Sequence, residues 1–311
     1  MITRRQFVTA AIGLAAGSCL DLPVARPASW RRGADAPTRR SEVAAAVLGE
    51  AIYVVGGFGG AGGLVEAYHP LANRWERRTT LPLGLHHTAV VAMNDYLFVV
   101  GGYRDGWIAS DAVLAYDAGA DRWQARRPMP TARGALAAAG HAGKIFAFGG
   151  AAASRNSTAT EVYDPVTDAW QARAPLPTGR DHHAAAVVDG KISVIGGRLN
   201  GSYARNLGIV EEYNPAADTW RMRAPLPTPR SGIGAAALRG RIYVVGGEAP
   251  EGTFSQVEIF DPVSNRWSRG PDLPTPRHGL GVVAFQGRLY VLAGGPTPGG
   301  SASAAVEILE P

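Results

Sequence analysis

Histidine and carboxylate side chains gather in a narrow zone that recurs along the chain. Five of the seven histidines lie there: His86, His87, His182, His183 and His278. Asp181 directly precedes His182. Carboxyl and imidazole groups are common general acids and bases, and two imidazoles with a carboxylate also suit a divalent metal. Glu42, His87 and His182 come from distant segments without local ligand spacing, so no metal and no cofactor are predicted.

Aromatic and charged residues follow this zone at nearby positions, which suggests a polar depression. Such a depression suits a sugar or a peptide. The candidate ligand-binding residues are Glu42, Phe58, His86, His87, Tyr103, Arg104, Trp107, Asp181, His182, Arg198, Tyr203, Glu248 and His278. An alternative interpretation is that the histidines are ordinary polar residues that hydrogen-bond backbone and water.

The elements that position these residues are repeated. Tryptophan recurs at spacings of 45, 48, 47, 50 and 47 residues, at Trp30, Trp75, Trp123, Trp170, Trp220 and Trp267. A pair of small residues follows each tryptophan after 26 positions, preceded by a short apolar segment typical of a buried strand. An aromatic residue lies seven positions before the next tryptophan and often opens an Asp-Pro or Asn-Pro turn. Trp107 is the only tryptophan outside this register.

The apolar strand, the glycine pair, the Tyr-Asp-Pro turn and the tryptophan together resemble the kelch repeat, from Trp30 to Pro311. The resemblance implies an all-β fold: a six-bladed kelch β-propeller with four antiparallel strands per blade. The chain ends at VEILEP, where the sixth tryptophan strand should follow, and it starts with an orphan strand around Trp30. The N-terminal strand should therefore close the last blade and leave no free sheet edge.

Length variation between repeats lies between the second and third strands of each blade. Insertions collect on the face that function uses, so these loops mark one rim of the propeller as its working rim.

A column of arginines follows the tryptophans by ten residues, and a column of glutamates precedes each Tyr-type position by two. The expected structural ion pairs are Arg40–Glu66, Arg133–Glu161, Arg180–Glu211, Arg230–Glu258 and Arg277–Glu307. In the second repeat both members are leucine, Leu85 and Leu114. This joint exchange indicates a buried pair within each blade, which an apolar pair can replace.

The first residues are typical of an export signal. Basic residues, including Arg4 and Arg5, precede an apolar stretch and small residues before Cys19. The paired arginines resemble a twin-arginine signal. We expect an export signal over residues 1–19, a short linker over 20–27 and the propeller over 28–311, in a periplasmic or secreted protein. A lipobox with a lipid anchor at Cys19 is the alternative to a cysteine that leaves with the signal.

The charge distribution argues against a nucleic-acid partner, and the hydropathy argues against a transmembrane segment. The net charge is +5 and the pI about 9.5, but the arginines are distributed by the repeat and form no single stripe. Nucleic acid is therefore not an expected partner. No apolar run reaches the length that a transmembrane segment requires, so none is predicted.

The resemblance leaves two functions open. The first is an exported, non-catalytic binding or interaction module, whose partner is a protein, a peptide or a carbohydrate at the working rim. The alternative is a sugar-handling enzyme of the mutarotase or epimerase type, acting on a sugar such as sialic acid. A copper radical oxidase of the galactose oxidase kind is excluded, because its cofactor needs a cysteine and none lies in the propeller.

Overall fold

The computed structural model describes residues 28–58, 60–153 and 155–311, which form strands and turns and no helix. The expected export signal over 1–19, with Cys19, and the expected linker over 20–27 lie outside the described residues. Among the residues described, nothing has the length and apolar character of a membrane-crossing helix.

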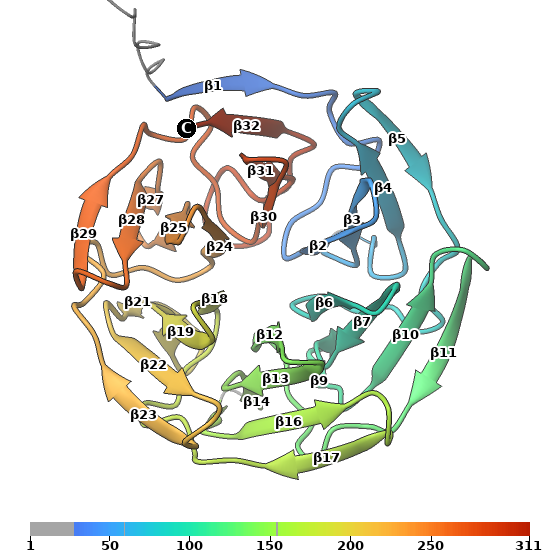
Figure 1. The fold of residues 1–311 in the computed structure, drawn as a ribbon. Coiled ribbons are helices and arrows are strands. Elements are labelled where there is room, and N and C mark those ends of the chain that lie inside the picture. Colours follow the sequence, from blue (N-terminus) through green and yellow to red (C-terminus); the bar gives the residue numbers. More distant parts are fainter. Residues whose placement is uncertain (1–27, 59, 154) are drawn as a thin grey trace, which may run out of the picture.

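Six four-stranded antiparallel sheets surround one axis as the blades of a propeller (Figure 1), which confirms the predicted fold class. The first three blades are β2 (Ala44–Leu48), β3 (Ala51–Val55), β4 (Val65–His69) and β5 (Arg74–Arg77); β6 (Ala89–Met93), β7 (Tyr96–Val100), β10 (Val113–Asp117) and β11 (Arg122–Arg126); and β12 (Ala137–His141), β13 (Lys144–Phe148), β16 (Thr160–Asp164) and β17 (Ala169–Ala172). The others are β18 (Ala184–Val188), β19 (Lys191–Ile195), β22 (Val210–Asn214) and β23 (Thr219–Met222); β24 (Gly234–Leu238), β25 (Arg241–Val245), β28 (Val257–Asp261) and β29 (Arg266–Arg269); and β30 (Gly281–Phe285), β31 (Arg288–Leu292), β32 (Val306–Glu310) and β1 (Ser29–Arg32). The first strand of each blade lies next to the axis.

The repeated tryptophans join neighbouring blades. The indole N–H of Trp123 on β11 donates to the carbonyl of Thr79, which follows the outer strand of the preceding blade, at 2.9 Å. Asp121 lies beside it and accepts from the hydroxyl of Tyr116 and from the backbone N–H of Thr79. Equivalent indole bonds occur at Trp75, Trp170, Trp220 and Trp267. The Tyr, Asp or Asn, and Trp positions of the repeat therefore form a latch between blades.

The N-terminal strand closes the ring as predicted. β1 pairs with β32, and Trp30 lies opposite Leu309 in the register. The indole N–H of Trp30 donates to the carbonyl of Pro271 at 3.0 Å, so the last latch joins blade six to blade five.

Replacing Trp30 by alanine is expected to lower the free energy of unfolding by about 3 kcal/mol, because packing against blade five and the latch bond are both lost. Chemical denaturation measures the change. Met222→Ala is the control, since Met222 is exposed on the outer strand of blade four and its loss should change stability by less than about 1 kcal/mol. An unfolding midpoint that Trp30→Ala leaves unchanged would contradict the closure by this strand.

The arginine column lies buried inside the blades. The guanidinium of Arg40 lies 2.8 Å from Glu66, that of Arg133 2.6 Å from Glu161 and that of Arg180 2.7 Å from Glu211. The corresponding pairs in blades five and six are Arg230–Glu258 and Arg277–Glu307.

A threonine also belongs to this group in five blades. Its hydroxyl donates to the second carboxylate oxygen of the glutamate, as Thr131 does to Glu161 at 2.8 Å. In blade two, this position, the arginine and the glutamate are all leucine, and Leu83, Leu85 and Leu114 pack in one apolar cluster. The exchange thus replaces a buried polar triad by an apolar one.

The loops between the second and third strands carry additional short hairpins on one rim. These are β8 (Tyr103–Arg104) with β9 (Ile108–Ala109), β14 (Ala151–Ala152) with β15 (Arg155–Asn156), β20 (Arg198–Leu199) with β21 (Ser202–Asn206), and β26 (Glu248–Ala249) with β27 (Gly252–Thr253). Single bridges such as Asp181↔Arg198 and Ser231↔Glu248 tie each loop to the segment before the first strand of its blade. The loops and the entrances to the inner strands therefore lie on the same rim.

Candidate functional site

The channel along the axis narrows at a ring of six backbone positions, one from each blade. These residues have positive φ angles between 51° and 64°: Glu42, His87, Ala135, His182, Gly232 and Gly279. In every member except Glu42, the backbone N–H donates to the carbonyl of the preceding member of the ring. The N–H of Val43 donates to the carbonyl of Gly279 and closes the ring. Alanine and glycine adopt this positive-φ conformation as well as Glu42, His87 and His182. The conformation is therefore a property of the fold and does not depend on the side chain.

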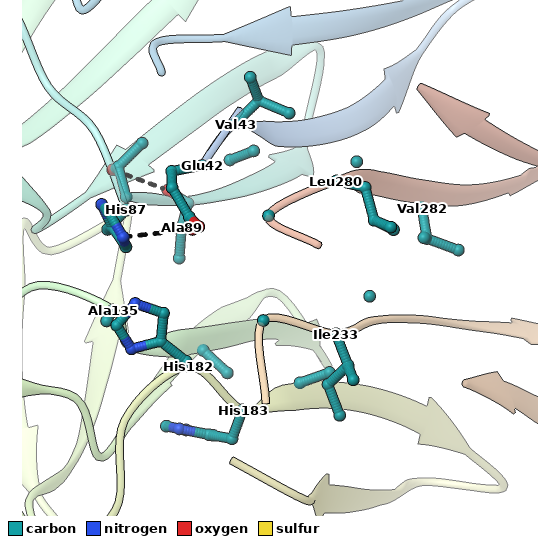
Figure 2. Close-up of a pocket in the computed structure, with 18 of the residues that line it drawn as sticks. Glu42, Val43, His87, Ala89, Ala135, His182, His183, Ile233, Leu280 and Val282 are labelled. Carbon is teal, nitrogen blue, oxygen red and sulfur yellow. Dashed lines mark hydrogen bonds and ion pairs between the residues drawn. The ribbon is translucent and has the colours of Figure 1, made fainter. Parts of the chain in front are cut away.

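The channel below this ring is a cavity of about 160 Å³, lined mostly by alanine, glycine, valine, leucine and isoleucine residues. Figure 2 shows Glu42, His87 and His182 grouped at one end, whereas Val43, Ile233, Leu280 and Val282 line the wall. Gly279 makes this grouping possible, because a Cβ there would lie 2.5 Å from a carboxylate oxygen of Glu42.

A buried imidazolium joins two carboxylates at this end of the channel. Nδ1 of His278 lies 3.0 Å from Glu42 and 3.6 Å from Glu248, and Nε2 lies 3.1 Å from the carbonyl oxygen of Thr297. Both ring nitrogens thus face acceptors. Burial opposes the charge, but Glu42 and Glu248 outweigh it and raise the pKa of His278.

Glu42 is ionised for the complementary reason. Its burial alone would raise its pKa, but the hydrogen bond from His278 and the positive charge of that ring hold the pKa of Glu42 well below its usual value. Nε2 of His87 lies 3.2 Å from the second carboxylate oxygen. Burial lowers the pKa of His87 itself far below the ordinary value, so this ring is neutral.

Arg198 links the remaining charges from the start of β20. Its guanidinium donates to Glu248 at 2.6 Å, to Asp181 at 3.3 Å and to Nε2 of His182 at 2.8 Å. Since arginine only donates, Nε2 of His182 accepts and its proton lies on Nδ1, which donates to Asp181 at 2.6 Å. Burial disfavours the charge of Asp181, yet His182, Gly201 and Arg198 lower its pKa to about 2.

Two groups of side chains have the geometry of a metal site, Glu42 with His87 and His182, and Glu42 with Glu248 and His278. A cation already lies in each of them. Arg198 occupies the nitrogen of His182 that a metal would need, and His278 is itself the cation between two carboxylates. The described side chains therefore neutralise one another in place of a metal.

An aromatic group lies beside this charge network in blades one and two. The indole of Trp107, which is 53% exposed, lies 5.3 Å from the ring of Phe58, 5.1 Å from His86, 5.0 Å from His87 and 5.2 Å from Tyr103. A cavity of about 340 Å³ opens against Trp107 and Tyr103, with Asp181, His182 and Arg198 on its polar side.

The predicted rim residues fall into three groups. Glu42, His87, Asp181, His182, Arg198, Glu248 and His278 form the charge network, and Phe58, His86, Tyr103 and Trp107 form the aromatic group. Tyr203 lies outside both groups, with its ring 5.6 Å from the guanidinium carbon of Arg198. Arg104 is exposed on β8 and lines neither cavity.

Sequence reasoning missed the neutral partners of the network. Asn156 donates to Asp181, Asn206 donates to the carbonyl of Glu248, and the backbone N–H of Gly299 donates to the Glu248 carboxylate. They come from loops that differ between repeats, so the repeat register carries no signal for them. His183 lies in the same sequence zone but packs inward, donates to the carbonyl of Phe148 and has a pKa that burial lowers to about 3.

Comparison with known proteins points to one family. The family model described as the KLHDC2/KLHL20/DRC7 Kelch-repeats domain matches residues 73–225 and 171–305, and the model described as the Kelch motif matches residues 39–82.

Two curated relatives resemble part of the chain. Beta-scruin from Limulus polyphemus is 30% identical over 139 residues, which cover 42% of this chain and 15% of that protein. Kelch-like protein 35 from Mus musculus is 33% identical over 101 residues, which cover 32% of this chain and 18% of that protein. The match spans less than a fifth of either relative.

Among solved structures, the one titled "Structure of YjhT" has the same fold. Its TM-score is 0.77 at 16% sequence identity, and the match covers 88% of this chain and 95% of that one. At this identity the likeness concerns the fold alone.

Proposed function

The chain belongs to the kelch-repeat family, and on that premise we propose that it is a non-catalytic binding module, which holds a segment of a partner protein on its working rim. The observation that carries the proposal is Trp107. A large aromatic side chain, half exposed and supported by four other rings, is the usual anchor of a protein interface.

The backbone of Trp107 supports the same role. It has a φ of +60° at the tip of the β8–β9 hairpin, next to Gly106 at +76°. Asparagine or glycine adopts this left-handed conformation with little strain, whereas tryptophan does not. A tryptophan at such a position is therefore better explained by what its side chain contacts than by the needs of the turn.

The charge network favours binding over turnover. A mutarotase needs an acid and a base that can exchange protons with a sugar. Asp181 accepts from His182, Arg198, Asn156 and the N–H of Gly201, so its oxygens are occupied within the protein. The network instead fixes the position of the loops that carry the binding surface.

Selection of a random peptide library on the protein, followed by affinity measurement on the recovered peptides, tests the proposal. Trp107→Ala should weaken their binding by about 30-fold, as expected for an aromatic anchor worth about 2 kcal/mol. Met222→Ala is the control, because Met222 is exposed on the outer strand β23.

Two results would contradict the binding module. One is full affinity of the selected peptides for Trp107→Ala. The other is accelerated anomer exchange of sialic acid by the wild-type protein that Asp181→Asn abolishes, which would establish the mutarotase instead.

A further inference from the structure

A third cavity shares Trp107 with the one that contains Arg198. Its volume is about 250 Å³, and Phe58, His86 and Trp107 form its aromatic part. Glycines supply most of the remaining wall, at positions 57, 60, 62, 63, 84 and 106. Because glycine has no side chain, this wall leaves room for a side chain from another molecule.

The charges around this cavity have one sign. Asp105 is the only acidic residue in its wall, and neither arginine nor lysine lines it. Asp105 is exposed and forms no ion pair within residues 28–58, 60–153 and 155–311, not even with the adjacent Arg104.

The aromatic rings favour a positively charged ligand, as the carboxylate of Asp105 does. Phe58 and Trp107 lie 5.3 Å apart with their planes at 52°, and His86 and Trp107 lie 5.1 Å apart at 81°. The ring planes are therefore not parallel, and the cavity is bordered by rings in different orientations. The electron-rich faces of phenylalanine and tryptophan attract ammonium and guanidinium groups, and a nearby carboxylate strengthens that attraction.

We propose that this cavity, formed by Phe58, His86, Trp107 and Asp105, binds a lysine or arginine side chain of the partner. The inference rests on the proposed binding function and names the chemistry that the working rim recognises. Trp107 then lines two cavities, and the cationic side chain enters the one without Arg198.

Titration of the whole protein with N-acetyl-arginine amide, and with the neutral citrulline analogue, tests the inference directly. NMR would follow the indole N–H of Trp107, assigned as the signal that Trp107→Phe removes. The arginine probe should cause a saturable shift and the citrulline probe should not. Asp105→Asn should weaken the arginine probe by about threefold to fivefold, as expected for an exposed ion pair.

Asp111→Asn is the matched control, since Asp111 is exposed in the same loop, carries the same charge and does not line the cavity. Equal shifts by both probes, no saturable shift up to the solubility of the arginine probe, or unchanged affinity in Asp105→Asn would overturn the cationic site. A separate failure is recognisable with the selected peptides. If Trp107→Ala abolishes their binding and Asp105→Asn leaves it intact, the binding module stands and the cationic site falls.

Discussion

Arg133→Leu alone is expected to lower the free energy of unfolding by about 3–5 kcal/mol, because it leaves the carboxylate of Glu161 buried without its cation. The guanidinium and carboxylate lie 2.6 Å apart and are buried. Replacing both residues by leucine should recover most of the loss, since the chain itself uses Leu85 and Leu114 at these positions in blade two.

The recovery should remain incomplete by about 1–2 kcal/mol, because Arg133 also donates to the carbonyls of Thr131 and Ala147. In blade two a hydroxyl at another position, that of Thr88, donates to the carbonyl of Gly101 at 2.9 Å. Blade three has Leu136 at the position of Thr88, so the double variant has no such hydroxyl there.

Denaturant unfolding of Arg133→Leu, Glu161→Leu and the double variant forms a complete cycle. The expected coupling between the two changes is several kcal/mol. Additive losses would show that the two residues contribute independently, and the ion pair would then have no role of its own in the blade.

The repeat register made most of the fold predictable, because it records contacts that every blade needs. Tryptophan at a fixed period marks the latch between blades, and the glycine pair marks the turn beside the axis, where Gly56 and Gly57 have φ angles of +66° and +122°. The joint change to Leu85 and Leu114 indicated the pair. The third member of the group, threonine, carries the same signal in the sequence, because blade two has Leu83 at the threonine position.

The candidate site was predictable as a zone but not as a network. Arg198 and Glu248 lie 50 positions apart, on different blades, and their contact depends on how side chains turn at the axis. A bulge in the pairing of β20 with β21 interrupts the regular hairpin near Asn206, which donates to the carbonyl of Glu248. Contacts between side chains that form between only one pair of blades leave no trace in the repeat register.

The role of Arg198 as the resident cation leads to the second large effect. Arg198→Met retains much of the side-chain volume and removes the charge that Asp181 and Glu248 share. At pH 7 the variant should lose about 3–5 kcal/mol of unfolding free energy. Arg205→Met is the matched control, because Arg205 is exposed on the neighbouring strand β21 and should change stability little.

The pH dependence of this loss has a definite sign. In the wild-type protein the pKa of Asp181 is lowered to about 2, so its stabilising contribution is present above the unfolded value of about 3.9 and is lost as the pH falls towards 2. Without Arg198 the pKa of Asp181 should rise. The difference in stability between wild type and variant should therefore shrink as the pH falls from about 4 towards 2. A difference that stays constant over this interval would mean that charge is not its cause.

Zinc binding tests whether Arg198 takes the place of a metal ion or only contributes to stability as a structural arginine. Removal of Arg198 frees Nε2 of His182, and one ring nitrogen of His182 lies with ligand atoms of Glu42 and His87 within 4.8 Å of one another. Zinc at 100 times its dissociation constant should then stabilise Arg198→Met by about 2.7 kcal/mol, whereas the metal-stripped wild-type protein should show no shift. A zinc-dependent shift in the wild type would show that the three ligands are accessible despite Arg198. Stabilisation confined to the variant would show that the guanidinium of Arg198 holds the place of a metal ion in the wild-type protein.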